Sequence, residues 1–358
     1  MRKVRVLVVE DSPTVRQRLV EIVGSDPDLE LVGAADNGRE GIELCQRHRP
    51  DVITMDMMLP IMSGLAATEY IMAHCPTPIL VVSASINRGE LFKIYEALAA
   101  GAVDVLEKPT GDEPDGVWEN RFLAMLKLVS RIRVITHPRA RLVGLRAPAP
   151  ELAGAKPVRS RTEPRHSVVA IGASTGGPGA IVEILRGLPA DFKLPILIVM
   201  HINEPFGSAF ADWLDGQTTR RVDHAREGMS VASAAGRVVL APGGRHMVVR
   251  AGRIYLTDDA ERHSCRPSVD ELFSSIADEY GPSAAACLLT GMGRDGALGL
   301  LKIRQAGGVT IAQDEATSVV YGMPREAVLI GAAQQVLRLR DIAPRLAALN
   351  GVTAEVPA

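Results

Sequence analysis

Short apolar runs alternate with amphipathic segments along the chain, and this alternation limits the possible folds more than any other feature. In the first part of the chain, the apolar runs cover residues 4–9, 51–55, 79–82 and 103–106. Segments with helical spacing of apolar residues lie between them, at 38–49, 64–74 and 87–100. Strands that alternate with helices are typical of a parallel, doubly wound sheet. The pattern therefore predicts an α/β fold.

The same alternation returns further along the chain, after a stretch of different texture. Apolar runs cover residues 168–171, 195–200, 237–241, 285–290 and 308–312. A length of 358 residues is natural for two domains. We predict two doubly wound parallel-sheet domains.

The segment between the two units predicts a flexible linker. Residues 136–165 contain five prolines, which interrupt any helix, and many arginines without an amphipathic period. A helix is expected at 118–135, just before this segment. The predicted boundaries are 1–125 for the first domain, 126–165 for the helix end and linker, 166–350 for the second domain and 351–358 for a C-terminal tail.

Composition excludes several classes of protein. The chain is 47% hydrophobic and 23% charged with a net charge of -2, so nothing global suggests a nucleic-acid partner. The four cysteines show no CxxC spacing and are expected to be free thiols of a reducing compartment. No apolar run approaches the ~20 residues of a membrane span, and the start lacks a signal peptide. We expect a cytoplasmic protein without membrane insertion.

Polar side chains stand where the strands of the first unit end. They are Glu10, Asp11, Asp56, Ser83 and Lys108. Carboxyl ends of parallel strands meet at one sheet edge, where ligands bind. Several acids there repel one another unless a cation joins them, and oxygen ligands suit Mg²⁺. The alternative, that each acid merely ends a strand in a polar loop, is weaker because all of them fall on the same edge.

The first unit resembles the receiver domain of two-component response regulators over residues 3–125. The resemblance rests on the residues just named, together with Met57–Pro60, Gly64, Ala84 and Pro109. It implies that Asp56 accepts a phosphoryl group from a histidine kinase. It also implies that Asp11, Asp56 and the Met58 carbonyl bind Mg²⁺ with help from Glu10, while Ser83 and Lys108 contact the phosphoryl oxygens. Val105 stands where receivers often carry an aromatic switch, so coupling through backbone shifts around Ser83 and Lys108 is expected instead.

A glycine-rich turn at 172–179 separates the first apolar run of the second unit from a helical segment at 180–185. It places Ser174 at a sheet edge, beside backbone N–H groups and a helix N-terminus. His201 and Asp295, also at predicted strand ends, supply the base and the orienting acceptor that a nucleophilic serine needs. Glycines around Met292 leave N–H groups for an oxyanion. The pattern alone leaves three alternatives open: a phosphate-binding turn, His246 as the base, and Asp295 as a turn former.

The second unit is similar to the catalytic domain of the CheB family of chemotaxis protein-glutamate methylesterases, over about 166–350. The segments that carry the resemblance are 171–177, 241–244 with His246, 267–270, 289–296 and 321–324. It implies a Ser174–His201–Asp295 triad with the Met292 N–H as oxyanion donor, and no cofactor for the ester chemistry. The family's usual Gln-His-Met-Pro is Met200-His201-Ile202-Asn203 here, which affects the expected receptor preference.

The two resemblances imply that the first domain is flavodoxin-like and the second Rossmann-like. Together they also imply a methylesterase controlled by phosphorylation. Its substrates would be methylated chemoreceptors, and deamidation of receptor glutamines is expected through the same acyl-enzyme. The receiver would cover Ser174 in the resting state, and phosphorylation of Asp56 would expose it. Two alternatives remain: a catalytically silent receptor-docking protein under phospho-control, and a nucleotide-binding domain that uses the glycine turn.

Overall fold

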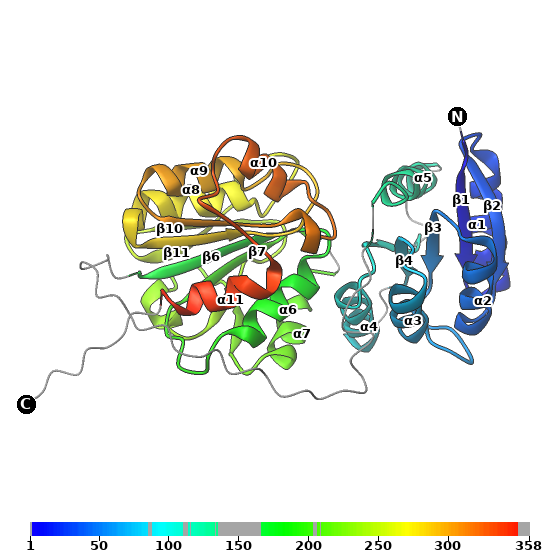
Figure 1. Ribbon diagram of the computed structural model, residues 1–358, viewed down its shortest axis with the longest axis horizontal. Helices are drawn as coiled ribbons and strands as arrows, with labels where there is room; N and C mark the ends of the chain where they lie inside the picture. The colour runs from blue at the N-terminus through cyan, green and yellow to red at the C-terminus, as the bar shows by residue number, and fades with distance from the viewer. Residues whose placement is uncertain are drawn as a thin grey trace, which may run out of the picture.

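The computed structural model describes residues 2–84, 88–109, 114, 116–132, 134, 166–202, 206–207 and 209–349. The predicted linker at 136–165, the predicted tail at 351–358 and Asn203 lie outside the described residues. Two α/β units are visible in Figure 1, the N-terminal one in blue and cyan and the C-terminal one in green to red. The prediction of two parallel-sheet domains is confirmed.

The N-terminal unit is a five-stranded parallel sheet in the order β2-β1-β3-β4-β5. Its elements are β1 (Val4–Val9), α1 (Pro13–Ser25), β2 (Leu29–Ala35), α2 (Gly38–His48), β3 (Val52–Met55), α3 (Gly64–His74), β4 (Ile79–Ser83), α4 (Arg88–Ala99), β5 (Asp104–Glu107) and α5 (Val117–Val129). Helices α1 and α5 pack on one face through Leu19, Phe122 and Leu126. The other three helices cover the opposite face.

The C-terminal unit is a seven-stranded parallel sheet in the order β14-β13-β12-β6-β7-β9-β8. Its elements are β6 (Val168–Ala173), α6 (Gly177–Gly187), β7 (Ile196–Met200), α7 (Phe210–Gln217), β8 (Val222–His224), η2 (Val231–Ala234), β9 (Val238–Leu240), β10 (His246–Arg250), β11 (Arg253–Thr257), α8 (Val269–Tyr280), η3 (Gly281–Ser283), β12 (Ala284–Leu288), α9 (Ala297–Gln305), β13 (Val309–Gln313), η4 (Glu315–Thr317), α10 (Met323–Leu329), β14 (Gln335–Leu337) and α11 (Leu339–Ala347). Helices α6, α7 and α11 cover one face, while α8, α9, α10 and the β10–β11 hairpin cover the other.

Local sequence signals explain the start of several helices, as at α1, α2, α3 and α8. Ser12 caps α1 by accepting a hydrogen bond from the Val15 N–H, and Pro13 occupies the first turn, where its missing N–H costs nothing. The predicted helix at 118–135 is wrong at its C-terminus, because α5 ends at Val129. There the Ser130 hydroxyl bonds back to the Lys127 carbonyl and the backbone tightens to i→i+3 bonds.

One antiparallel hairpin, β10–β11, was not predicted from the sequence. Its strands pair from His246–Thr257 to Arg250–Arg253 across a turn at Ala251 and Gly252. Both turn residues have positive φ, which fits a two-residue hairpin loop. The hairpin packs on α8 and covers one side of the second sheet.

The two units share one apolar interface, centred on α4 of the first and on α6 and α7 of the second (Figure 1). The ring of Tyr95 lies 5.4 Å from the rings of both Phe210 and Trp213, and its hydroxyl donates to the Phe206 carbonyl. Gly179 permits the close approach, because a Cβ there would stand 3.2 Å from the Ala99 carbonyl oxygen. Arg88 at the start of α4 also forms an ion pair with Asp212 of α7. The arrangement of the two units is therefore held by tight packing as well as by charge.

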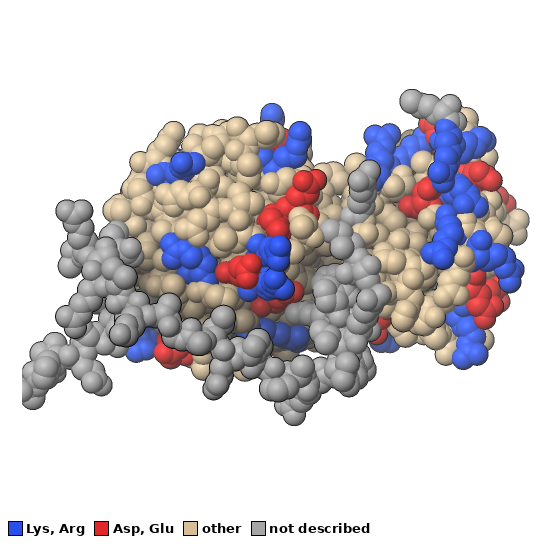
Figure 2. Space-filling model, viewed as in Figure 1, with Lys and Arg blue, Asp and Glu red and all other residues tan. Residues whose placement is uncertain are grey.

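Charged side chains of both signs are interspersed over the N-terminal unit on the face in Figure 2, whereas the C-terminal unit shows a broader uncharged area there. Across the described part of the chain, every helix is too short or too polar to span a lipid bilayer.

Candidate active site

The three residues of the predicted triad follow neighbouring strands of the second sheet. Ser174 follows β6, His201 follows β7, and Asp295 lies in the turn after β12. Strand β6 is flanked by β12 on one side and β7 on the other, and chain order reverses there. In doubly wound sheets this switch point is the usual ligand site, because loops leave it in opposite directions. The fold thus brings all three residues to one place.

Asp295 is a buried carboxylate with its oxygens fully engaged. Oδ1 accepts from the Ser268 hydroxyl at 2.7 Å, and from the N–H groups of Asp270 and Gly296 at 3.1 and 3.0 Å. Oδ2 accepts from the Val269 N–H at 2.7 Å and lies 2.8 Å from His201 Nε2. Burial opposes the charged form, but these bonds outweigh it and hold the pKa of Asp295 below its ordinary value. The group therefore stays ionised.

His201 is oriented by this carboxylate. With Nε2 on Asp295, the other ring nitrogen, Nδ1, is directed away from it and lies 3.7 Å from Cys265 Sγ. Burial lowers the stability of the charged ring, yet the bonds to Asp295 and Cys265 prevail and raise the pKa of His201 to about 9. This imidazole is more basic than an ordinary histidine, so the neutral ring is a stronger proton acceptor but is less populated at neutral pH.

Ser174 lies in a turn that is fixed by hydrogen bonds on both sides. Its N–H donates to the Thr290 carbonyl and its carbonyl accepts from the Gly177 N–H. The Thr290 hydroxyl donates to the Thr175 carbonyl at 2.9 Å. Gly291 has to be a glycine, because a Cβ there would stand 2.7 Å from the Ser174 Cβ. Among the described residues, no hydrogen bond joins the Ser174 hydroxyl to His201, as is common before a substrate is bound.

The turn with Met292 borders a surface cavity of about 520 Å³, which is also lined by Cys265 and Asp295. Among the described hydrogen bonds, none has the Met292 N–H as its donor, so this group is free to meet a developing oxyanion. The role of Met292 stays a prediction that this geometry permits.

His246, the alternative base, is held elsewhere. It is fully buried in β10, where Nδ1 accepts from the Ser268 N–H and Nε2 lies 3.2 Å from the Ala260 carbonyl. Both ring nitrogens are thus committed to the backbone. Sequence reasoning also assigned no role to Ser268, Thr290 and Cys265. Ser268 and Thr290 act through hydrogen bonds that no spacing pattern signals, although they lie within the 267–270 and 289–296 segments that carried the resemblance.

The predicted receiver site also comes together. Lys108 Nζ lies 2.8 Å from Glu10 Oε2 and 3.0 Å from Asp56 Oδ2, and Ser83 donates to Asp56 at 3.4 Å. Glu10 and Asp56 are buried, while Asp11 is exposed at the mouth. Burial and the charge of Asp56 raise the pKa of Glu10, although Lys108 opposes them.

The donor set of this site fits Mg²⁺. One oxygen of each of Glu10, Asp11 and Asp56 lies within 4.8 Å of the others. Magnesium prefers carboxylate oxygens and waters, which an exposed Asp11 allows. The Met58 side chain is exposed, and the role of its carbonyl as a ligand stays a prediction.

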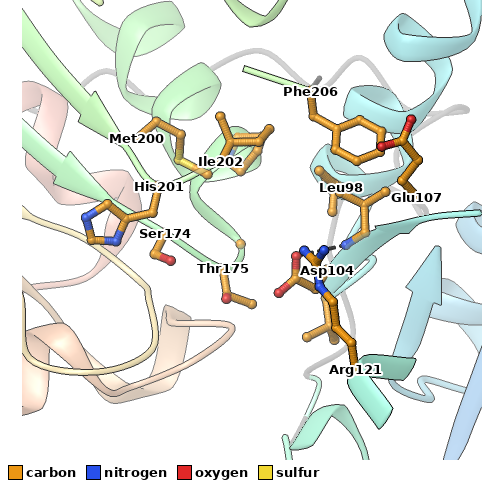
Figure 3. A pocket seen from close by; sticks show the side chains of 14 residues that line it. Leu98, Asp104, Glu107, Arg121, Ser174, Thr175, Met200, His201, Ile202 and Phe206 are labelled. Atoms are coloured by element: carbon orange, nitrogen blue, oxygen red, sulfur yellow. Dashed lines mark hydrogen bonds between the residues drawn. The ribbon is translucent and has the colours of Figure 1, made fainter. Parts of the chain in front are cut away.

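The two candidate sites are separated by the interface between the units. A cavity of about 160 Å³ lies there, and Figure 3 shows its two walls. Ser174, Thr175 and His201 line it from the catalytic side, and Asp104 and Arg121 from the receiver side. Val105, at the position of the absent aromatic switch, also lines this cavity. The receiver thus covers the serine turn directly.

Comparison with known proteins agrees with both units. Residues 169–346 match the family model of the CheB methylesterase, and residues 6–114 match that of the response regulator receiver domain. A protein-glutamate methylesterase/protein-glutamine glutaminase of Nitrosospira multiformis is 43% identical, with 98% of each chain covered. One from Anaeromyxobacter dehalogenans is also 43% identical, with 95% of each chain covered. The Thermotoga maritima CheB methylesterase catalytic domain is 35% identical with a TM-score of 0.49, covering 51% of this chain and 98% of that chain.

Proposed function

Because the chain belongs to the CheB family of protein-glutamate methylesterases, we propose that it removes methyl esters from receptor glutamate side chains when its receiver is phosphorylated. The observation that carries the proposal is the Asp295–His201 pair beside the Ser174 turn at the switch point of the second sheet. The relatives' second named activity, on protein glutamine, requires the same acyl-enzyme. We extend it to this chain on that ground.

The proposed reaction has two steps, and the same imidazole serves in both. The Ser174 hydroxyl attacks the ester carbonyl while His201 Nδ1 takes its proton, and the Met292 N–H faces the oxyanion. Methanol leaves with that proton, which forms an acyl-enzyme. Water then attacks with His201 as base, and the free glutamate and serine are restored. Asp295 holds the tautomer and stabilises the charged ring throughout.

The receiver supplies the control in this proposal. Asp56 accepts the phosphoryl group from a histidine kinase, and Ser83 and Lys108 contact its oxygens. Glu10, Asp11, Asp56 and the Met58 carbonyl would hold Mg²⁺, which would supply neutralising charge for the transfer when bound. Lys108 pairs with the Asp56 carboxylate in this structure. After phosphorylation of Asp56, the Lys108 ammonium group would turn to contact a phosphoryl oxygen instead. Both partners, the kinase and the receptor glutamates, would be met in the cytoplasm.

The nucleophile is tested by replacing Ser174 with alanine. Methanol release from methylated receptor should fall by about a million-fold in Ser174→Ala, the scale for loss of a triad serine. Ser233→Ala, a surface serine in the same unit, is the matched control and should release methanol normally. Equal release from Ser174→Ala and the unmodified chain would favour another nucleophile. No release from either would favour the silent docking protein, and tight nucleotide binding would favour the nucleotide-binding alternative.

The control step is tested separately with Asp56→Asn. A small phosphoryl donor with Mg²⁺ should raise methanol release in the unmodified chain and leave Asp56→Asn at its basal rate. The exposed Asp36→Asn, at the end of β2, is the matched control and should respond like the unmodified chain. Stimulation of Asp56→Asn would contradict a gate that opens through this carboxylate.

A further inference from the structure

Cys265 is a thiol at the catalytic centre that the proposed reaction does not use. Its Sγ lies 3.7 Å from His201 Nδ1, and Asp295 completes a group of three side chains whose ligand atoms lie within 4.8 Å of one another. Thiolate and imidazole are the ligands preferred by zinc and other thiophilic divalent cations. The combination differs from the all-oxygen receiver site, which suits a hard cation.

The geometry points to a thiophilic cation site between Cys265 and His201, with Zn²⁺ as the preferred ion and reversible inhibition of the esterase as its effect. This inference rests on the proposed function for its effect on activity, while its binding part stands independently. Cys265 Sγ would lose its proton to water and ligate together with His201 Nδ1.

The separation of the two ligand atoms matches such a site. Bonds of about 2.3 Å to sulfur and about 2.0 Å to nitrogen, at a tetrahedral angle, place S and N about 3.5 Å apart. The observed separation is 3.7 Å, so the cation fits with little movement of either side chain. A hydrogen-bonded thiol would give a similar distance, and for this reason the test below measures the metal directly.

The surroundings of His201 favour a metal on Nδ1. A metal-binding histidine commonly gives its other ring nitrogen to a carboxylate, which fixes the ring and increases its basicity. Asp295 already does this at 2.8 Å, and four other donors hold Asp295 itself in place. The orientation of the ring is therefore fixed before any cation arrives.

The cation has a route to the site that the receiver does not block. Cys265 lines the cavity of about 520 Å³ on the side of Met292 and Arg294, not the cavity that the receiver covers. Waters from this cavity would complete the coordination. With only two protein ligands, we expect binding weaker than at a structural four-ligand zinc site.

The effect on catalysis follows from the nitrogen involved. His201 Nδ1 is the atom that accepts the Ser174 proton in the proposed reaction, and a nitrogen that ligates a cation has no lone pair left for it. Inhibition should therefore be complete at saturation and should be reversed by a chelator.

The test uses the full chain with Co²⁺ as a spectroscopic probe. We expect a thiolate-to-cobalt charge-transfer band in the unmodified chain, loss of the band in Cys265→Ala, and a band that remains in Cys45→Ala. The last variant is the control for the buried Cys45–Cys75 pair, whose sulfurs are also 3.7 Å apart. Absence of the band in the unmodified chain, or its persistence in Cys265→Ala, would overturn the inference.

Activity provides the second readout, as the ratio of methanol release with and without Zn²⁺ for each variant. Phosphoryl donor and Mg²⁺ are present throughout. Cys265→Ala should need at least tenfold more Zn²⁺ for half inhibition, whereas Cys265→His should keep much of the sensitivity but lose the cobalt band. Equal Zn²⁺ sensitivity in the unmodified chain and Cys265→Ala would contradict the site. If the methylesterase proposal itself were wrong, the band would appear without any methanol release.

Discussion

Asp56 and Asp295 stand at corresponding places in two similar parallel sheets, yet they are held in different ways. Asp295 accepts three backbone N–H groups, a serine hydroxyl and an imidazole. Asp56 accepts one backbone N–H, from Met57 at 2.7 Å, and otherwise meets the side chains of Lys108 and Ser83.

This difference fits the roles that we propose for the two carboxylates, Asp295 as an orienting acceptor and Asp56 as the phosphoryl acceptor. Backbone donors fix Asp295 in a single ionised arrangement, which an orienting acceptor requires. The partners of Asp56 are mostly side chains, which can turn away when a phosphoryl group arrives. In the proposed function, Asp295 keeps its hydrogen bonds throughout the reaction, whereas Asp56 changes its charge and partners when it is phosphorylated.

Within the comparison of the two carboxylates, the largest effect is expected when Asp295, the proposed orienting group, becomes an amide. Asp295→Asn should lower kcat for methanol release by about 10⁴-fold, because an amide neither selects the tautomer nor stabilises the charged ring. The NH₂ group of the amide would also face backbone N–H donors, and two donors cannot form a hydrogen bond with each other. Steady-state methanol release from the phosphorylated chain measures the effect.

Asp278→Asn is the matched control for this change, because Asp278 lies on the surface of α8 and pairs with Lys302. It should keep the activity of the unmodified chain. A loss of less than tenfold in folded Asp295→Asn would show that Asp295 is not the orienting group.

The next effect concerns the base that Asp295 orients. With the pKa of His201 at about 9, the neutral ring that can accept a proton is scarce at neutral pH. The value of kcat/KM should therefore rise about tenfold per pH unit from pH 6 and level off near 9. A pH–rate profile in the presence of a chelator measures this.

The raised pKa of His201 also makes the free energy of unfolding depend on pH. The folded chain binds this proton more tightly than the unfolded one, so the stabilisation is present below about pH 6.5 and is lost as the pH rises towards 9.

Cys265→Ala should move the rising limb of the pH–rate profile to lower pH, because the thiol contributes to the raised pKa of His201. A profile that is already level at pH 7 in the unmodified chain would contradict the shift.

The sequence was sufficient to predict that these groups meet, and the reason is topological. Parallel strands bring their carboxyl ends to one edge, so Ser174, His201 and Asp295 converge once each is placed at a strand end. The environment of each group was not predictable in this way. Cys265 and Ser268 reach the site from the segment between the β10–β11 hairpin and α8, and no periodic pattern marks such a segment.

Three further features of the structure, the β10–β11 hairpin, the end of α5 and the interface between the units, also depend on contacts that a sequence pattern does not show. The hairpin was missed because its strands, five residues each, lie between elements of a parallel sheet to which they do not belong. The early end of α5 depends on the Ser130 hydroxyl competing for a helix carbonyl, whereas apolar spacing continues past it. The interface between the units depends on surface shape at Gly179 and Ala99, which spacing does not encode.

A smaller effect, opposite in sign to that of Asp295→Asn, is expected when Asp56 becomes an amide. Asp56→Asn removes one of two buried carboxylates that share Lys108, and Glu10 keeps its partner. Without Mg²⁺, the free energy of unfolding of the receiver should increase by about 1 kcal/mol in Asp56→Asn, because repulsion between the two carboxylates is relieved. Asp295→Asn should instead lower the free energy of unfolding of the second unit by about 1–3 kcal/mol, because buried hydrogen-bond donors lose their acceptor.

Urea unfolding followed by Trp118 fluorescence in a Trp213→Phe background reports on the receiver, since these are the two tryptophans of the chain. Added Mg²⁺ should stabilise the unmodified chain more than Asp56→Asn, and EDTA should remove that difference. If Asp56→Asn destabilised the receiver in EDTA, the attraction between Lys108 and Asp56 would be stronger than the repulsion between Asp56 and Glu10.

The smallest effect tests the cavity that joins the two regions. Asp104 lines it from the receiver side, opposite the Ser174 turn, with Arg121 beside it (Figure 3). Burial raises the pKa of Asp104 to about 6, although the Val105 N–H and Arg121 oppose the shift. If the closed interface causes this burial, the closed state binds the Asp104 proton more tightly than the open state, and acid favours closure.

The ratio of basal to phosphorylated activity isolates this coupling, because the titration of His201 affects both rates alike. In the unmodified chain the ratio should fall about two- to threefold as the pH drops from 7.5 to 5.5, since a protonated Asp104 no longer opposes closure. In Asp104→Asn, which imitates the protonated form, the ratio should be low at both pH values. A ratio that responds equally to pH in both chains would place the burial of Asp104 within the receiver itself. The contact between the two regions would then be insensitive to pH, and opening would depend on Asp56 alone.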